Sequence, residues 1–204
     1  TNVGTSHIEL LGSREAIAQA KGELIRCLPE NSVAILNEDD PYVKAMDSLA
    51  KGKTITYGIE RNATCIGSHL RYKKDGIKFT CKCYDEVFDI FLPMIGEHNV
   101  YDALAAIVAG RVLGIKSNTI RKGLSEFTGT PMRQEIVPFE DIVILNDAYN
   151  ANPSSMAEAI KALGQLEGKR KIAMLGDMLE LGDYTEQAHR EIGQLLAEEG
   201  YSVV

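Results

Sequence analysis

The chain of 204 residues is long enough for one large domain or two modest ones. Hydrophobic residues make up 45% of it and charged residues 25%, which is ordinary for a soluble globular protein. The formal net charge of -7 argues against a nucleic-acid-binding surface, which is normally basic. No apolar run approaches the roughly 20 residues of a membrane span, and no signal-peptide pattern is present, so we expect a cytoplasmic protein without membrane insertion.

In the first third of the chain, short β-prone runs alternate with helical patterns. Ser13 is placed to cap a helix that continues to about residue 28, and a second helix is expected over residues 41–49. Short strands are expected at residues 32–36 and 54–57. This alternation predicts βαβ units and a parallel sheet.

The pattern then changes to one of consecutive strands. Three β-prone segments, at about 63–72, 77–83 and 86–92, are separated by turn-forming residues that include an Asp-Gly pair, a strong hairpin signal. We therefore expect an antiparallel meander attached to the parallel sheet. Cys81 and Cys83 would share one face of a strand as small buried hydrophobes, so we expect reduced thiols and no structural metal.

A domain boundary is expected after two further helices, at about 99–113 and 117–126. Gly, Thr and Pro gather at residues 127–131, between a helix and the next pair of strands. We therefore expect one domain over residues 1–127 and the first part of a second over residues 128–204.

The second domain also reads as an α/β unit, with strands at about 134–138, 142–147 and 171–175 and helices at 153–166 and 183–199. The run at 142–145 is short and β-branched enough to be a buried parallel strand. Pro153 stands at the first position of the next helix, with Asn152 as its cap.

The polar turn that follows residue 145 is where we expect a ligand. In open α/β sheets, ligands bind at the carboxyl ends of strands. Asp147, Tyr149, Asn150 and Asn152 would then all line one crevice. The residues alone leave open the alternative that Asp and Asn stand here only as good turn formers.

Four stretches, taken together, resemble the Mur ligase family. They are residues 1–7 with 18–24, residues 96–106, the turn at 147–156, and the turn at 175–182. The resemblance covers essentially all 204 residues. The last two turns are most similar to those of the members that join D-alanyl-D-alanine to a UDP-N-acetylmuramoyl tripeptide.

The resemblance implies a fold. Family members are cytosolic enzymes with a domain that binds the UDP-sugar, a central ATP-binding domain and a Rossmann-like C-terminal domain. This chain would hold the second half of the central domain, a parallel sheet plus the antiparallel meander, and the first part of the C-terminal domain. It would be a piece of a longer protein, because it begins inside a motif and stops where a strand would start.

The resemblance also implies a reaction in peptidoglycan precursor synthesis. ATP phosphorylates the terminal carboxylate of the tripeptide, and the amine of D-alanyl-D-alanine attacks the acyl phosphate, releasing ADP and phosphate. Mg²⁺ is expected because anionic phosphates and a carboxylate must approach one another. We expect the enzyme to be a monomer.

For the metal, the family pattern points to His7 and Lys21. His7 matches a histidine that ligates Mg²⁺, and Lys21 matches a lysine that is carbamylated. A carbamate offers hard oxygen ligands, whereas an ammonium would repel the ion. Carbamylation needs a neutral amine, which burial or a nearby cation favours. Without the family context, a lysine on a helix is usually solvated.

The adenine of ATP is expected at His98 and Asn99, which open a helix and match the family segment that packs against the base. Asn99 could also simply cap the helix, and that role is compatible with contact to a ligand. Asp102 departs from the family, which usually has asparagine there. An acid accepts a hydrogen bond from the adenine amino group but cannot donate one.

The rest of the nucleotide is expected between the two domains. Arg133 matches an arginine that contacts the ATP phosphates, a task that suits a rigid guanidinium. Asp147 matches an acid that meets the ribose or a nearby phosphate. Tyr149 and Asn150 belong to the same motif and are assigned to the ATP site with it.

The incoming dipeptide is expected near Asn152 and Asp177, which lie in two successive turns at one edge of the sheet. Asp177 is equally consistent with a helix cap.

One motif is missing, and its absence leaves alternatives open. No G-x-x-x-x-G-K-[ST] loop for the β- and γ-phosphates occurs in the sequence, so we expect this chain alone to lack ligase activity. The first alternative is another amino-acid ligase of the superfamily, such as a folylpolyglutamate synthase-like enzyme. The second is a non-catalytic binding module that has lost the phosphate loop.

Overall fold

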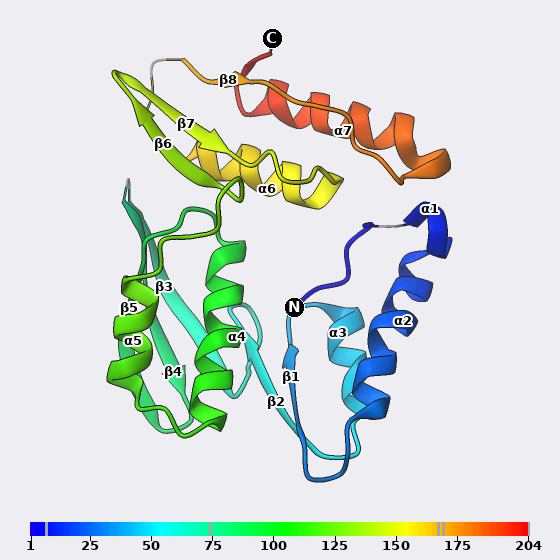
Figure 1. The fold of residues 1–204 in the computed structure, drawn as a ribbon, viewed down its shortest axis with the longest axis vertical. Coiled ribbons are helices and arrows are strands. Elements are labelled where there is room, and N and C mark those ends of the chain that lie inside the picture. Colours follow the sequence, from blue (N-terminus) through cyan, green and yellow to red (C-terminus); the bar gives the residue numbers. More distant parts are fainter. Residues whose placement is uncertain (7, 74, 167, 169, 204) are drawn as a thin grey trace.

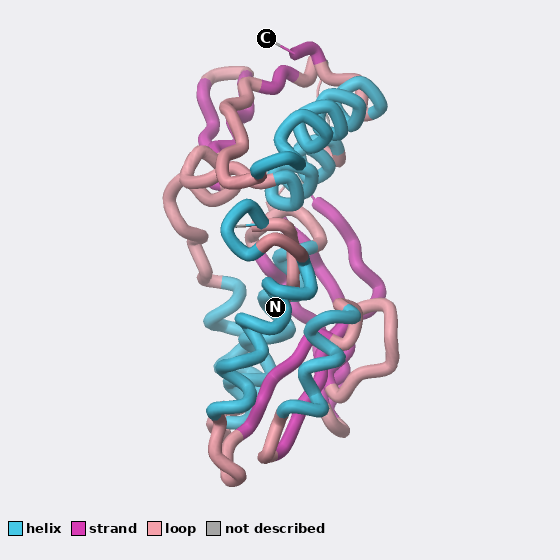
Figure 2. The backbone as a smooth tube through the Cα atoms, turned by 90° about the vertical axis from the view of Figure 1, so that its right-hand side faces the viewer, coloured by secondary structure: helices cyan, strands magenta, loops and turns pink. Residues whose placement is uncertain are grey.

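A computed structural model describes residues 1–6, 8–73, 75–166, 168 and 170–203. Figure 1 shows a larger sheet with its helices in the lower half and a smaller group of helices and strands above it. Figure 2, turned by 90°, shows the same two groups stacked along the long axis of the molecule. No helix in these ranges is long and apolar enough to cross a membrane.

The larger group is built on a five-stranded mixed sheet. Its strands lie in sequence order, namely β1 (Val33–Asn37), β2 (Lys53–Gly58), β3 (Cys65–Lys73), β4 (Gly76–Cys83) and β5 (Glu86–Leu92). β1, β2 and β3 are parallel, whereas β3, β4 and β5 are antiparallel. The expected parallel sheet with an appended meander is therefore confirmed.

Helices α1 (Ile8–Leu11), α2 (Arg14–Cys27), α3 (Pro41–Ala45), α4 (His98–Val112) and α5 (Ser117–Ser125) belong to this group. Ser13 caps α2 as expected, because its hydroxyl accepts a hydrogen bond from the backbone N–H of Ala16 at 3.1 Å. The helix expected over 41–49 is α3 followed by a 3₁₀ turn, η1 (Met46–Leu49).

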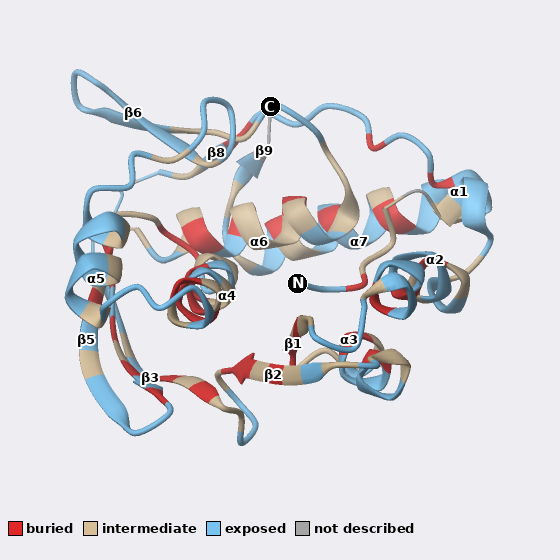
Figure 3. Cartoon of the chain, turned by 60° about the horizontal axis from the view of Figure 1, so that its bottom comes forward, coloured by how far each residue is buried: buried red, intermediate tan, exposed pale blue. Residues whose placement is uncertain are grey.

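The core of this group lies on both faces of the sheet. Along β1, successive side chains alternate: Val33 and Ile35 pack toward α4, while Ala34 and Leu36 pack toward α2 and α3. Figure 3 shows buried segments of α4 facing the strands. Burial of a large apolar side chain stabilises the fold by roughly 1.5–3 kcal/mol, so the fully buried residues of α4 anchor it firmly. They are Val100, Leu104, Ile107 and Val108.

The thiols of β3 and β4 belong to the same core. Cys81 and Cys83 are both fully buried, which confirms that they share one face of the strand. Cys65 on β3 is also buried, and its Sγ lies 3.6 Å from the Sγ of Cys81.

The N-terminal end of α4 is tied to the sheet by Asp39. Its carboxylate accepts hydrogen bonds from three consecutive backbone N–H groups, at residues 59–61, and from the Tyr101 hydroxyl at 3.1 Å. A Cβ atom at Gly58 would lie only 2.7 Å from the same carboxylate, so glycine is required there. These bonds hold the start of α4 against the carboxyl ends of β1 and β2.

The smaller group follows a linker at 126–134. It contains the hairpin β6 (Glu135–Phe139) and β7 (Ile142–Asn146), helix α6 (Pro153–Gly164), the short parallel pair β8 (Ile172–Ala173) and β9 (Ser202–Val203), the 3₁₀ turn η2 (Gly182–Tyr184), and helix α7 (Thr185–Glu198). Met156 and Ile160 of α6 pack with Ala188, Ile192 and Leu196 of α7 in its core.

Two expectations for this group are wrong. The run at 142–145 is not a buried parallel strand: within the described ranges β7 pairs only with β6, and it does so antiparallel. Ile142, Val143 and Ile144 are exposed, because none of the elements that the structure describes covers that part of the hairpin. The strand expected at 171–175 is reduced to the two residues of β8.

Candidate functional site

A cavity of about 530 Å³ lies where the two groups of elements meet. It is bounded by α2, by the N-terminal end of α4, by the linker and by the start of α6. Six residues expected at the site line it together: Lys21, His98, Asn99, Arg133, Asp147 and Asn152. The structure thus brings together side chains that are up to 131 positions apart in the chain.

Local structure explains how two of these side chains reach the cavity. Asp147 directly follows β7, so it stands at the carboxyl end of a strand, as predicted. Asn152 is the N-cap of α6, and its Oδ1 accepts a hydrogen bond from the backbone N–H of Ser155 at 3.0 Å. Pro153 follows at the first helical position.

The proposed metal ligands can be described only in part. His7 lies outside the described residues. Lys21 lines the cavity, but it is exposed, and its Nζ donates a hydrogen bond to the backbone oxygen of Asn2 at 2.9 Å. The burial that would favour carbamylation is therefore not provided at this lysine.

The described residues do not by themselves fit a magnesium ion. Among them, no three His, Cys, Asp or Glu side chains are grouped so that they could hold a metal. An unmodified ammonium at Lys21 would repel Mg²⁺, whereas a carbamate there would present oxygen ligands to the cavity. A fit thus depends on that modification and on His7.

His98 and Asn99 form a hydrogen-bonded corner of the cavity. The Asn99 Nδ2 atom lies 2.6 Å from the backbone oxygen of Ile95, 3.0 Å from His98 Nε2 and 3.3 Å from Gln134 Oε1. The chain reaches this corner through Gly96, whose φ of 86° is a left-handed conformation. A Cβ atom at Gly96 would lie 2.5 Å from the His98 ring, so the turn needs glycine on both counts.

Two aspartates at the cavity have pKa values above the ordinary value of the residue. Burial raises the pKa of Asp147 above its ordinary value, although the Gln134 backbone N–H, His98 and Arg133 oppose the shift. Loss of water contact likewise raises the pKa of Asp102, with His98 opposing. Asp102 has accessible surface, but that surface faces the cavity, where protein replaces part of its hydration.

Arg133 is held in place from outside the cavity. Its guanidinium lies 4.0 Å from the centre of the Tyr149 ring, a stacking distance. The Tyr149 backbone N–H also donates to the Met132 oxygen at 3.1 Å. Tyr149 itself is 64% exposed and does not line the cavity, so its observed contact is with the arginine.

Asn150 and Asp177 border a different cavity. This second cavity, of about 680 Å³, lies between β7, α6 and the segment after β8, and Asp147 borders both cavities. The side chain of Asp177 is 89% exposed, with its Oδ1 3.8 Å from His189 Nε2. The expectation that all four residues of the turn line one crevice is therefore wrong.

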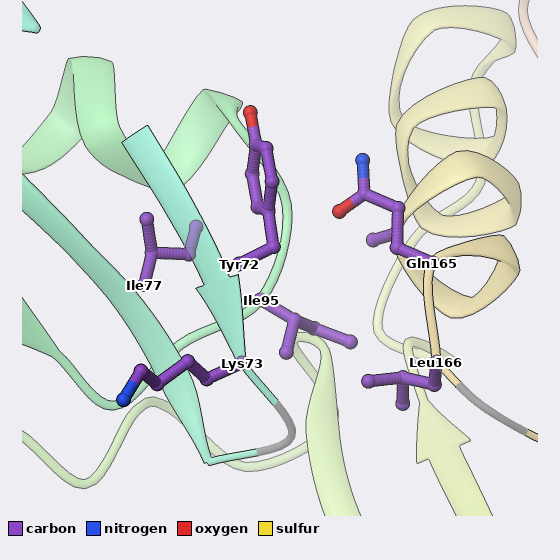
Figure 4. A pocket seen from close by; sticks show the side chains of 7 residues that line it. Tyr72, Lys73, Ile77, Ile95, Gln165 and Leu166 are labelled. Atoms are coloured by element: carbon purple, nitrogen blue, oxygen red, sulfur yellow. The ribbon is translucent and has the colours of Figure 1, made fainter. Parts of the chain in front are cut away.

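The reason is local geometry. α6 begins at Pro153, so its cap Asn152 lies at the main cavity, while Asn150, two residues earlier in the chain, borders only the second cavity. A third, smaller cavity of about 320 Å³ lies between the β3–β4 hairpin and the C-terminal end of α6. Figure 4 shows Tyr72 and Gln165 facing each other across it, with the aliphatic side chains of Ile77, Ile95 and Leu166 nearby.

Three residues that we did not single out also line the main cavity: Asn37, Gln134 and Glu158. Asn37 is only 6% exposed and stands at the end of β1. Ligands of parallel sheets bind at such strand ends, so the sequence position of Asn37 could have predicted its place at the site. The sequence contains no such indication for Glu158, because Glu158 and Lys161, three residues apart, have the spacing of an ordinary ion pair on a helix surface.

Two protein-family models match this chain. The model of the Mur ligase middle domain matches residues 1–110, more than half of the chain. The chain belongs to the Mur ligase family. The model described as Mur ligase, glutamate ligase domain, matches residues 132–204 of this Mur ligase chain. The family expected from the four sequence stretches is thus confirmed.

Named relatives are similar to nearly the whole chain. The chain is 42% identical over 199 residues to the UDP-N-acetylmuramoyl-tripeptide–D-alanyl-D-alanine ligase of Bacillus subtilis. The aligned region is 97% of this chain and 42% of that protein. MurF from Acinetobacter baumannii superposes with a TM-score of 0.92 at 30% identity, over 99% of this chain and 44% of that one.

A third relative was solved with a nucleotide. The MurF ligase of Thermotoga maritima in complex with ADP superposes with a TM-score of 0.86 at 26% identity, over 96% of this chain and 45% of that one. The fold expected for the Mur ligase chain is confirmed by these matches. The chain spans less than half the length of the relatives it matches.

Proposed function

We propose that this Mur ligase chain is part of an ATP-dependent ligase of peptidoglycan precursor synthesis. The enzyme would join D-alanyl-D-alanine to a UDP-N-acetylmuramoyl tripeptide in the cytoplasm, acting as a monomer. The name of the Bacillus subtilis relative supports the substrates, and the ADP bound to the Thermotoga maritima relative supports the nucleotide. The observation that carries the proposal is the single cavity that gathers Lys21, His98, Asn99, Arg133 and Asp147.

In this proposal the two groups of elements belong to two domains. Residues 1–127 form the second half of the central ATP-binding domain, and residues 128–204 form the first part of the Rossmann-like C-terminal domain. The linker that carries Arg133 would then connect them, and the nucleotide would lie between them. This arrangement is common in ligases whose domains close over the substrate.

We assign the adenine to the corner made by His98 and Asn99. Arg133 would contact the phosphates, because its guanidinium is already stacked on Tyr149 and loses little freedom when it binds an anion. Asp147 would meet the ribose, whose hydroxyl groups can donate hydrogen bonds to its carboxylate. Asn150, which borders the neighbouring cavity together with Asp147, would act from that side.

The reaction transfers the γ-phosphoryl group of ATP to a carboxylate oxygen of the tripeptide, and ADP leaves. The amine of D-alanyl-D-alanine then attacks the acyl carbon, the C–O bond to phosphate breaks, and the amine gives up a proton. We place the dipeptide near Asn152 at the main cavity, with Asp177 reaching it only from the neighbouring cavity. Water exclusion between the domains would protect the acyl phosphate from hydrolysis.

We further propose that Lys21 is carbamylated in the active enzyme and holds Mg²⁺ together with His7. The ion would balance the charge of phosphates and carboxylate. The position of Lys21 on the cavity wall supports this assignment, since a carbamate there would face the nucleotide.

The test is ligase turnover by the intact protein that contains this chain, with and without Lys21→Ala, and with bicarbonate added to both. We expect turnover with D-alanyl-D-alanine, and a fall of roughly 100-fold or more in Lys21→Ala, since loss of a metal ligand removes the ion's contribution. Arg26→Ala, five residues along the same helix and outside the cavity, is the matched control and should leave the rate unchanged.

The other outcomes separate the alternatives. Turnover that survives Lys21→Ala would keep the ligase but make Lys21 an ordinary solvated lysine. Turnover with a different amino acid in place of the dipeptide would indicate another ligase of the superfamily, such as a folate enzyme. No turnover with any acceptor would favour a binding module.

A further inference from the structure

The Asn99 side chain has only one possible orientation. Its Nδ2 atom lies 2.6 Å from the backbone oxygen of Ile95, and a carbonyl oxygen only accepts hydrogen bonds. The atom on that side of the amide must therefore be the nitrogen. A further acceptor, Gln134 Oε1, also faces this nitrogen at the longer distance of 3.3 Å.

The orientation of Asn99 determines where the His98 ring carries its proton. The Asn99 amide nitrogen carries two hydrogens and does not accept, and its two shortest contacts are the Ile95 oxygen and His98 Nε2 at 3.0 Å. We therefore assign the second hydrogen to His98 Nε2, which accepts it through its lone pair. In a neutral imidazole the proton then resides on the other nitrogen, Nδ1. Imidazole in water does not favour this tautomer, so something in the protein has to stabilise it.

The Nδ1 atom of His98 is buried, and it has no hydrogen-bond partner among the described residues. The acceptor that faces it is the carboxylate of Glu158 on α6, with Oε2 at 3.5 Å. This distance is that of an ion pair, slightly too long for a good hydrogen bond. A small rotation of either side chain would complete the bond.

Glu158 is suited to this role. The His98 ring and, to a lesser extent, the Lys161 ammonium hold the pKa of Glu158 below its ordinary value, so the side chain is a carboxylate at neutral pH. Its other oxygen, Oε1, lies 3.5 Å from Lys161 Nζ, which leaves Oε2 for the histidine. Figure 1 shows α6 lying across one end of α4, and the 3.5 Å distance joins Glu158 of α6 to His98 at the start of α4.

We propose that Glu158 is a positioning residue for the nucleotide: it stabilises the Nδ1–H tautomer of His98, which in turn orients the Asn99 amide. Residues of the C-terminal group thereby shape the corner that is formed by the start of α4. This inference rests on the proposed function, because it takes the corner at His98 and Asn99 as the adenine site.

The first experiment measures the tautomer directly. In a long-range ¹H–¹⁵N correlation spectrum at mildly alkaline pH, the His98 ring should show the pattern of a neutral imidazole protonated at Nδ1. The signal is assigned by its loss in His98→Gln. In Glu158→Ala the pattern should change to the Nε2–H form or to a mixture, while Glu158→Gln, which keeps an acceptor, should restore it. A wild-type His98 protonated at Nε2 would overturn the proposal, as would a pattern indifferent to Glu158→Ala.

The second experiment measures the consequence in the intact ligase. We expect Glu158→Ala to raise KM for ATP roughly five- to ten-fold while kcat changes less than about two-fold, because only ground-state positioning is lost. Glu158→Gln should stay within about two-fold of the wild type. Lys161→Ala removes the exposed ion pair without touching His98, and should leave both constants unchanged.

A double variant separates direct from indirect action. If Glu158 acts through His98, adding Glu158→Ala to His98→Ala should raise KM no further. Fully additive effects would overturn the proposed route. An intact protein without ligase turnover would refute the proposed function, whereas the tautomer measurement would still decide whether Glu158 positions His98.

Discussion

Asp102 illustrates how the cavity sets the charge of single residues. Its carboxyl loses part of its hydration to the cavity walls. Its pKa is raised in the folded protein, so the folded state holds the proton more tightly than the unfolded chain does. The carboxylate form is therefore the less stable one in the fold, and stability decreases as pH rises between the unfolded and the folded pKa.

We predict that Asp102→Asn stabilises the protein at pH 7 by about 0.5 kcal/mol, a modest value because the cavity is open to solvent. The gain should vanish below about pH 3, where the wild-type carboxyl is protonated in both states. Urea unfolding across this range measures it. Asp85→Asn, in the exposed β4–β5 turn, is the control and should show no such gain. Destabilisation at pH 7 by Asp102→Asn would contradict the prediction.

At the scale of elements, the start of α6 determines which side chains face the cavity. Asn152 accepts from the Ser155 backbone N–H, and the Ser155 hydroxyl accepts from the Asn152 backbone N–H, so the two residues form a capping box. Pro153 disfavours helical backbone at the residue before it, and Asn152 is accordingly extended, so the helix begins at Pro153. The cap therefore sets both the first turn of α6 and the register that carries Glu158 to His98.

Asn152→Ala is expected to destabilise the protein by about 1 kcal/mol, the usual effect of losing a helix cap. The free energy of unfolding in urea measures this. Asn118→Ala is the matched control, because Asn118 lies in the first turn of α5, where no side chain caps the helix, and its Oδ1 accepts a long hydrogen bond from Arg121 at 3.5 Å. Equal losses in the two variants would mean that capping does not account for the effect.

At the scale of the whole molecule, the candidate site is shared between two groups of elements. The family models match residues 1–110 and 132–204, and the cavity takes residues from both stretches. Neither group would hold the nucleotide as we propose without the other. The sequence also contains no G-x-x-x-x-G-K-[ST] phosphate-loop motif.

We predict that the 204-residue chain by itself shows no ligase turnover, measured as phosphate release with ATP, the UDP-linked tripeptide and D-alanyl-D-alanine. The intact protein, assayed in parallel, is the positive control. Phosphate release above background by the 204-residue chain would contradict this prediction.

Patterns within short stretches predicted most of the elements. Ser13 and Asn152 cap the helices expected from their positions, and the strands of the meander pair as the hairpin signal indicated. The prediction failed at residues 142–145, since an apolar β-branched run does not reveal whether another element covers it. It also failed at Asn150, whose direction depends on where α6 packs.

The sequence by itself determined the element types and the helix starts, because periodicity, caps and turns act between residues a few positions apart. It also determined the family, because the four motifs that resemble it are short stretches of sequence. Only the tertiary structure decided which side chains meet. His98 and Glu158 are 60 positions apart, and their encounter depends on α6 lying across the start of α4. Such contacts arise from the packing of whole elements against one another, and no local pattern in the chain encodes them.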